Sequence, residues 1–276
     1  MLFTGGGGAG NEALWRNLNE NYEVHFGDAN IDNIDLSIPQ DNRHTVPYGT
    51  SMNFIDKLLD LCNRLEIDLL VPGVDEELLV FAQNVKKFLP TKILLPHKSF
   101  VKTMLNKFHM IKHLQRKGIE VPKTYLLSYS NYHLSMPCIS KPIYGRGSVN
   151  IFYLNNSNDV TKLKENLVDN LDNYIIQEKI EGSEYTVQMI CNENKVLRAI
   201  IPVKIFYKRG ITIRAVIDNN ATVIKNGSKF LRLRQKTVLV SRVLFRMCHT
   251  LNAYHSEKRP YPSRNYKKHQ ISIPYI

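Results

Sequence analysis

The sequence predicts an α/β fold in two successive parts, a parallel sheet with helices and then an α+β unit. Up to about residue 97, short apolar strand patterns alternate with helical patterns, as in β-α-β units. After that point a helical segment is followed by several strand patterns joined by tight turns. The 276 residues also exceed a typical single domain, which favours more than one compact unit.

The first part opens with a β-α-β pattern. Leu2 to Thr4 indicate a strand, and a run of glycines leads into a helix with Leu14 and Leu18 on one face. Residues 29–50 are rich in Asn, Asp, Pro and Ser and indicate loop. The further elements expected in this part are a strand over 22–26 that leads to Asp28, a helix over 54–65, a strand over 67–71, a helix from 74 and a strand over 92–95.

The second part begins with a helical pattern over residues 99–117. Gly118 ends this helix as a C-cap glycine would. Another helix is expected over 163–171. Strands are expected from about residue 121, at 137–142, 149–153, 174–178, 184–191, 196–203 and 211–217.

Composition excludes several classes of protein. Hydrophobic residues make up 43% and charged residues 22%, and no apolar run approaches the roughly 20 residues that cross a bilayer. The N-terminus has neither the basic nor the apolar region of a secretory signal, so we expect a cytoplasmic protein. The four cysteines lie far apart, and no His stands at ligand spacing, which predicts reduced structural thiols and no zinc site.

The net charge of +12 comes from one end of the chain. Residues 1–218 hold 25 Lys and Arg against 24 Asp and Glu, whereas residues 219–276 hold 12 against Glu257 alone. The latter segment keeps neither the helical nor the strand period. We therefore treat residues 219–276 as a basic tail of unassigned fold, and expect no nucleic-acid partner for the rest of the chain.

A glycine loop follows the strand that ends at Lys141-Pro142. It contains Gly145, Arg146, Gly147 and Ser148 and leads into another strand. Glycines let the backbone N–H groups approach an anion, and Lys141 and Arg146 supply positive charge. The segment is therefore a candidate phosphate-binding loop, with an ordinary glycine turn as the alternative.

The glycine run near the N-terminus allows a second interpretation. Gly5, Gly7 and Gly10 stand between a strand and a helix, and Asp28 ends the next strand. This spacing satisfies the dinucleotide-binding fingerprint, in which an acidic residue about 20 positions on binds a ribose. An NAD-dependent oxidoreductase is therefore one alternative for the function.

Six segments in the same order resemble the ATP-grasp family, in particular the large chain of carbamoyl-phosphate synthase. The resemblance covers roughly residues 2–218. It implies a Rossmann-like domain over residues 1–97 and an ATP-grasp domain over 98–218, incomplete at its C-terminal end. The six segments are the glycine turn at 5–10, residues 72–78, residues 106–108, residues 118–124, the loop at 141–148 and residues 176–186.

The resemblance implies a role for each of several residues. ATP phosphates would be contacted by Lys107 and Lys141 and covered by the backbone of Gly145, Arg146, Gly147 and Ser148. Glu178 with the backbone of Lys179 and Ile180 would hold adenine, and Glu184 would hold the ribose. Arg214 would act as a catalytic residue on the transferred phosphoryl group. Substrate would be bound by Gly7, Gly8, Asn11, Glu12, Asp75 and Glu76, with helix capping as the alternative for Asn11 and Glu12.

The resemblance also implies Mg²⁺, whose ligands we do not find. The family places acidic ligands on two later strands, in a Glu-x-Asn segment, and this chain has only Glu257 after Asp218. Our hypothesis is that the tail is out of frame or otherwise foreign to the fold. The alternative is an authentic basic tail that binds an anionic partner such as RNA.

The function expected from the resemblance is ATP-dependent ligation. A carboxylate or bicarbonate would be phosphorylated to an acyl phosphate, which a small-molecule amine or another nucleophile would then attack. The alternatives that remain are the NAD-dependent oxidoreductase and a protein that binds ATP without catalysis.

Overall fold

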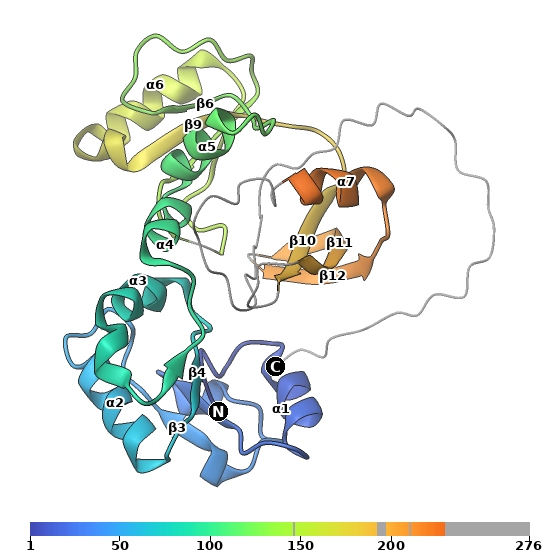
Figure 1. Cartoon of the computed structure of the whole chain (residues 1–276). Coiled ribbons are helices and arrows are strands. Elements are labelled where there is room, and N and C mark those ends of the chain that lie inside the picture. The colour runs from blue at the N-terminus through green and yellow to red at the C-terminus, as the bar shows by residue number, and fades with distance from the viewer. Residues whose placement is uncertain (146, 192–196, 210, 230–276) are drawn as a thin grey trace. The chain divides into compact units, whose positions relative to one another are not determined.

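The computed structural model describes residues 1–145, 147–191, 197–209 and 211–229 (Figure 1). The chain divides into two compact units, one ending at Lys102 and the other beginning at Thr103. This division falls within helix α4 (Lys98–Leu105), a few residues after the boundary expected at residue 97. None of the helices in the described ranges combines the length and the apolar character that crossing a membrane requires.

The first unit is built on a five-stranded sheet in the order β3-β2-β1-β4-β5, and all of its paired strands are parallel. The parallel α/β arrangement predicted from the sequence is therefore present. Its elements are β1 (Leu2–Thr4), α1 (Asn11–Leu18), β2 (His25–Asp28), β3 (Arg43–Thr45), α2 (Phe54–Arg64), β4 (Leu69–Val71), α3 (Asp75–Asn84) and β5 (Lys92–Ile93), with short 3-10 turns η1 (Ile31–Asn33), η2 (Gln40–Asn42) and η3 (Val85–Phe88).

Helices cover both faces of this sheet, as parallel strands require. Leu2 and Leu70 belong to one buried cluster with α2 and α3, whereas Phe3 and Phe26 pack on the other face against α1. Figure 1 shows α1 across the sheet from α2 and α3. From β1 the strand order runs outward through β2 to β3 on one side and through β4 to β5 on the other. The carboxyl ends of β1 and β4 therefore form the switch point, which is where α/β proteins bind ligands.

The second unit contains two antiparallel sheets, each with its own helix. One has the order β6-β9-β7-β8 and packs against α6, and the other has the order β10-β11-β12 and packs against α7. Its elements are α5 (Lys107–Arg116), β6 (Thr124–Leu126), β7 (Cys138–Pro142), β8 (Phe152–Leu154), α6 (Ser157–Asn166), η4 (Val168–Asn173), β9 (Tyr174–Glu178), β10 (Glu184–Cys191), β11 (Leu197–Arg209), β12 (Ile211–Ile217) and α7 (Ala221–Lys229).

Several elements differ from the expectation. The helix expected over 163–171 is replaced by α6 (Ser157–Asn166), which begins earlier, and the 3-10 turn η4 (Val168–Asn173). The loop expected over residues 29–50 contains the edge strand β3, and the helix expected over 99–117 breaks at Asn106, whose side chain caps α5 by accepting from His109 N at 2.9 Å. Residues 221–229, expected within an unassigned tail, form α7, whose Val223 is buried against the three-stranded sheet. The rest of the predicted tail, 230–276, lies outside the described residues.

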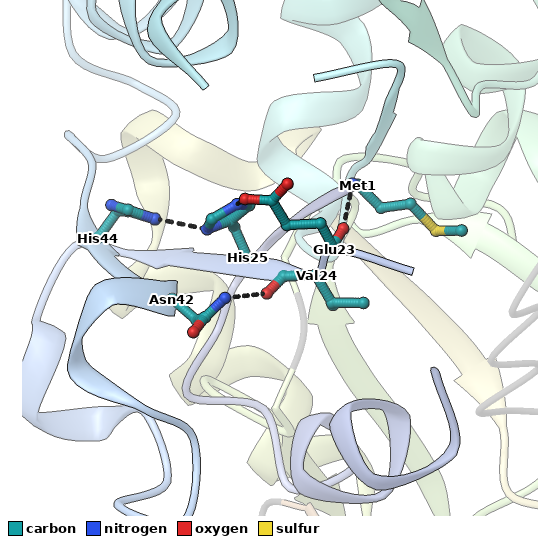
Figure 2. A network of polar contacts seen from close by, with 6 residues as sticks. All are labelled: Met1, Glu23, Val24, His25, Asn42 and His44. Atoms are coloured by element: carbon teal, nitrogen blue, oxygen red, sulfur yellow. Dashed lines mark hydrogen bonds and ion pairs between the residues drawn. The ribbon is translucent and has the colours of Figure 1, made fainter. Parts of the chain in front are cut away.

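Pairing of β2 with β3 brings two histidines together. His25 Nδ1 and His44 Nε2 are 3.1 Å apart, and His25 Nε2 lies 3.1 Å from Glu23 Oε1 (Figure 2). Because a carboxylate only accepts, His25 Nε2–H donates to Glu23, and His44 Nε2–H then donates to His25 Nδ1. Burial, helped by His25 and Arg64, lowers the pKa of His44 to about 4.

We expect this pKa to make the fold sensitive to mild acid. The folded chain keeps His44 neutral at pH values at which the unfolded chain, with an ordinary pKa of 6.5, takes up a proton. The stabilisation is complete above about pH 6.5 and declines as the pH falls towards 4, by about 1–2 kcal/mol for a half-buried ring. Urea unfolding at pH 7.5 and 5 measures it. His44→Gln, which keeps an N–H donor, is expected to have the smaller pH dependence, and equal dependence would contradict the assignment.

Candidate functional site

A buried lysine stands at the end of β7. Lys141 is 2% exposed, and its Nζ donates to Gln177 Oε1 on the neighbouring strand β9 at 2.9 Å. Gln177 Nε2 in turn donates to Thr124 Oγ1 on β6 at 2.6 Å. Strand register puts these three polar side chains on the sheet face opposite α6. The ammonium is therefore held in a fixed, water-poor position at the root of the following loop.

The loop after β7 has the backbone conformation that glycine permits. Gly145 and Gly147 have φ of 98° and 71°, and Ser148 also has a positive φ of 60°. No atom of the residues that the structure describes lies within 4 Å of a Cβ built on Gly145, which leaves the backbone there open to a ligand on their side. Arg146, predicted to add charge to this loop, lies outside the described residues.

Lys107 joins helix α5 to the same loop. Its backbone N–H donates to Ile143 O at 2.8 Å, and its Nζ donates to Gly145 O at 2.7 Å. Two predicted phosphate-binding lysines thus belong to one loop, Lys141 at its base and Lys107 against its backbone. This arrangement can neutralise an anion that the loop N–H groups cover.

The predicted adenine-binding segment follows β9. Glu178 Oε1 accepts from Lys123 N at 2.8 Å, and Glu178 N donates to Lys123 O at 3.1 Å. These two bonds fix the end of β9 beside the segment that enters β6. Lys179 is exposed and Ile180 half-buried in the connection to β10.

The predicted ribose ligand and the predicted catalytic arginine lie on the three-stranded sheet. Glu184 begins β10 and forms an ion pair with Lys208 of β11. Arg214 of β12 is exposed, and its guanidinium stacks over Phe206 at 5.9 Å from the ring centroid. Glu184 keeps acceptor positions for hydroxyl donors beside its ion pair with Lys208, because a carboxylate has two acceptor oxygens. The contact with Phe206 orients the Arg214 guanidinium.

The predicted substrate residues of the first unit lie at the switch point. Gly7 N donates to Asp28 Oδ2 at 2.9 Å, and the Asn11 side chain donates to Gly5 O at 2.8 Å. Asn11 thus ties the glycine turn to the helix, while α1 has Gly10 as its N-cap and no side-chain cap. Gly8 is exposed, Glu12 pairs with Arg16, and Asp75 and Glu76 open helix α3 after β4.

The glycine turn is filled by the protein itself. A Cβ on Gly7 would stand 2.5 Å from Asn33 Cβ, and Asp28 already accepts from Gly7 N and from Asn30 N. In a dinucleotide site the second glycine admits the pyrophosphate and the acidic residue binds the ribose. Here both features serve contacts within the chain, which weakens the oxidoreductase interpretation.

Some partners in this site were not expected from the sequence. Gln177 and Thr124, which hold Lys141, and Lys208, which pairs with Glu184, are brought in by strand pairing. The one available signal was a glutamine following two isoleucines within the strand pattern 174–178. As for Mg²⁺, no cluster of three or more His, Cys, Asp or Glu suited to a metal ion occurs among the residues that the structure describes.

The chain matches a known protein family. The family model of the ATP-grasp domain matches residues 104–227, which confirms the predicted resemblance to ATP-grasp proteins and extends it beyond residue 218 into α7. A search of curated protein sequences finds no match.

Solved structures share the fold. They include the carboxyaminoimidazole ribonucleotide synthase of Aspergillus clavatus complexed with ATP (TM-score 0.64, 16% identity, covering 87% of this chain and 69% of that one). The L-amino acid ligase of Bacillus licheniformis matches with TM-score 0.62, 11% identity and coverage of 86% and 61%. The biotin carboxylase domain of the Hydrogenobacter thermophilus 2-oxoglutarate carboxylase matches with TM-score 0.60, 13% identity and coverage of 84% and 57%. The chain thus spans 57–69% of the length of these three proteins, and the likeness is one of fold.

Proposed function

We propose that the chain binds ATP and belongs to an ATP-dependent ligase that joins a carboxylate to an amine or another nucleophile, because the ATP-grasp family model matches residues 104–227. The observation that carries the proposal is the buried Lys141 ammonium at the root of the glycine loop. A desolvated cation attracts an anion more strongly than a solvated one. The ATP-complexed synthase and the amino acid ligase among the similar structures support the same class.

We assign ATP phosphates to the loop and its two lysines. Lys141 would donate to a phosphate oxygen from its fixed position. Lys107 would exchange its bond to Gly145 O for a second phosphate contact, and the N–H groups of Gly147 and Ser148 would cover the anion. The positive φ values of Gly145 and Gly147 support a loop that curls over a ligand.

Adenine and ribose would be held after β9. Glu178 has one carboxylate oxygen on Lys123 N, and its other oxygen would accept from the adenine amino group. The backbone of Lys179 and Ile180 would supply the remaining edge contacts, and Glu184 would accept from the ribose hydroxyls. The ion pair with Lys208 would hold the Glu184 carboxylate in place at the start of β10.

The proposed reaction has two steps. A carboxylate or bicarbonate oxygen attacks the γ-phosphorus of ATP, ADP leaves, and an acyl phosphate forms. The nucleophile then attacks the acyl carbon, and inorganic phosphate leaves. Arg214 would stabilise the charge of the transferred phosphoryl group. Gly7, Gly8, Asn11, Glu12, Asp75 and Glu76 at the switch point of the first unit would bind the acceptor.

Magnesium is expected with ATP in this family of enzymes, and it would neutralise the phosphate oxygens. The described residues do not gather a set of carboxylates that fits the ion, so the proposal assigns no step to it. A measurement of ATP turnover by this chain therefore distinguishes a ligase from a protein that only binds ATP. We also propose that the ligase is of the carbamoyl-phosphate-synthase type and that its first domain is Rossmann-like. Both proposals depend on the six segments that resemble that family in the same order.

The proposal is tested in two stages with the full chain. Isothermal titration with ATP, and separately with NAD, is expected to show binding of ATP alone. An assay of ADP release over a panel of carboxylates and amines, with bicarbonate included, is then expected to show turnover that depends on one acceptor pair. Binding of NAD without ATP would overturn the ligase class, and ATP binding without release on any pair would leave the binding function only.

A further inference from the structure

A second candidate site lies in the first unit, at the outer edge of the parallel sheet. A cavity of about 570 Å³ is bounded on one side by the edge strand β3 and on the other by helix α2. This volume falls in the range of small-molecule sites. Its polar and charged lining includes Arg43, His44, Thr45, Tyr48, Lys57, Asp60 and Arg64.

The charge of this lining is mostly positive. Arg43, Lys57 and Arg64 bring three cations, against the single carboxylate of Asp60. Within the described part of the chain, none of these four side chains forms an ion pair. Cations that line one cavity and outnumber its carboxylates repel each other, and an anion bound among them would relieve that repulsion.

Arg43 is the fixed member of the group. Its side chain is half-buried, and its Nε is covered by protein without a hydrogen-bond partner among the described residues. Withdrawing part of a guanidinium from water without a partner costs free energy. The remaining nitrogens of Arg43 can offset this cost by binding an anion, for which the planar guanidinium fork is suited.

The wall beside Arg43 adds neutral hydrogen-bonding groups. His44 lines the cavity and is held through its Nε2 by His25 (Figure 2). Its ring stays neutral near pH 7 because its pKa is lowered to about 4, which leaves Nδ1 as an acceptor. Thr45 and Tyr48 add hydroxyl groups, and β3, as an edge strand, presents unpaired backbone groups on this side.

We propose that this cavity binds a small molecule through its phosphate group. The cations approach from two sides, Arg43 from β3 and Lys57 and Arg64 from α2, so the ligand must present acceptor oxygens in several directions. A tetrahedral phosphate dianion does this and matches the net charge, whereas a planar carboxylate engages a single guanidinium. The inference does not rest on ATP binding, whose assigned residues all lie after Thr103.

The test measures thermal unfolding and isothermal titration of the full chain with sodium phosphate, glycerol 3-phosphate and sodium acetate, each against sodium chloride at equal ionic strength. Phosphate is expected to raise the Tm above the chloride value, and Arg43→Gln to weaken phosphate binding about 10-fold or more. Stronger binding of glycerol 3-phosphate than of phosphate would assign the site to a phosphate ester, and the reverse to free phosphate. Acetate binding equal to that of phosphate would overturn the proposal.

Two further variants separate a site from a general salt effect. Phosphate stabilises many proteins by exclusion from their surface, and such an effect would persist in every variant. Arg64→Gln on the exposed face of α2 should fold normally and is expected to weaken binding as well. Lys86→Gln, an exposed lysine of η3 outside the cavity lining, should bind as the wild type does. Equal Tm shifts in wild type, Arg43→Gln and Arg64→Gln would refute the site.

Discussion

Replacing Lys141 by methionine is expected to weaken ATP binding by about 10- to 100-fold, because a buried charge-assisted hydrogen bond contributes about 1.5–3 kcal/mol. The ammonium is 2% exposed and is held by Gln177, so its position in the site is fixed by the protein. Methionine has a similar length and is apolar, so it removes the charge while keeping most of the packing. Isothermal titration with ATP measures the loss.

The matched control is Lys162→Met on the exposed face of α6, which should leave ATP affinity unchanged. Thermal unfolding of both variants separates a local loss of affinity from a loss of fold, since Lys141→Met also leaves Gln177 Oε1 without this donor. If a folded Lys141→Met variant bound ATP with wild-type affinity, Lys141 would not contact the phosphates, and the main argument for the proposed function would be lost.

Local patterns predicted the parts of the fold whose burial follows one period. The expected strands at residues 184–191 and 211–217 agree with β10 and β12. In β10 every second residue is buried, with Tyr185, Val187 and Met189 against α7 and the end of α5. A half-buried antiparallel strand shows its pattern in the sequence alone, because its two faces meet different surroundings.

Elements that depend on tertiary pairing could not be predicted in the same way. The residues of β3, Arg43 to Thr45, carry no apolar alternation and become a strand only because β2 offers an open edge. In α7, Gly227 lowers the helical signal, and the helix is stabilised by burial of Val223 against the sheet. In both cases the contact with the sheet determines the structure.

The residues of the candidate site also fall into those that a local pattern predicts and those that strand pairing brings in. The lysine and glycines of the loop are consecutive in sequence, so their spacing predicted them together. Gln177 and Thr124 reach Lys141 only through the strand order β6-β9-β7, which no local pattern contains. The dinucleotide fingerprint is a case in which the spacing is present but the site is not open. Asp28 and Asn33 contact the glycine turn where a dinucleotide would bind.

Replacing Gly73 by alanine is expected to destabilise the first unit by more than about 3 kcal/mol, at the upper end of overpacking effects. A Cβ at this position would stand 2.1 Å from the backbone oxygen of Thr4, closer than any real contact. Backbone cannot move aside as a flexible side chain can, and Gly73 N also donates to Thr4 Oγ1 at 3.0 Å. Relief of the overlap would therefore separate the carboxyl ends of β1 and β4. Urea unfolding at pH 7.5 measures the loss.

Gly10→Ala is the control, because no atom of the described residues lies within 4 Å of a Cβ built there and its φ is −98°. Alanine at this helix N-cap is expected to lower the free energy of unfolding by about 0.5–1 kcal/mol, because glycine is the better N-cap residue. The pair compares one glycine that the close approach of two strands requires with one that no contact requires. Similar stability of the two variants would show that the first unit does not need the close approach of β1 and β4. The proposed acceptor site at the ends of these two strands would then lose its structural support.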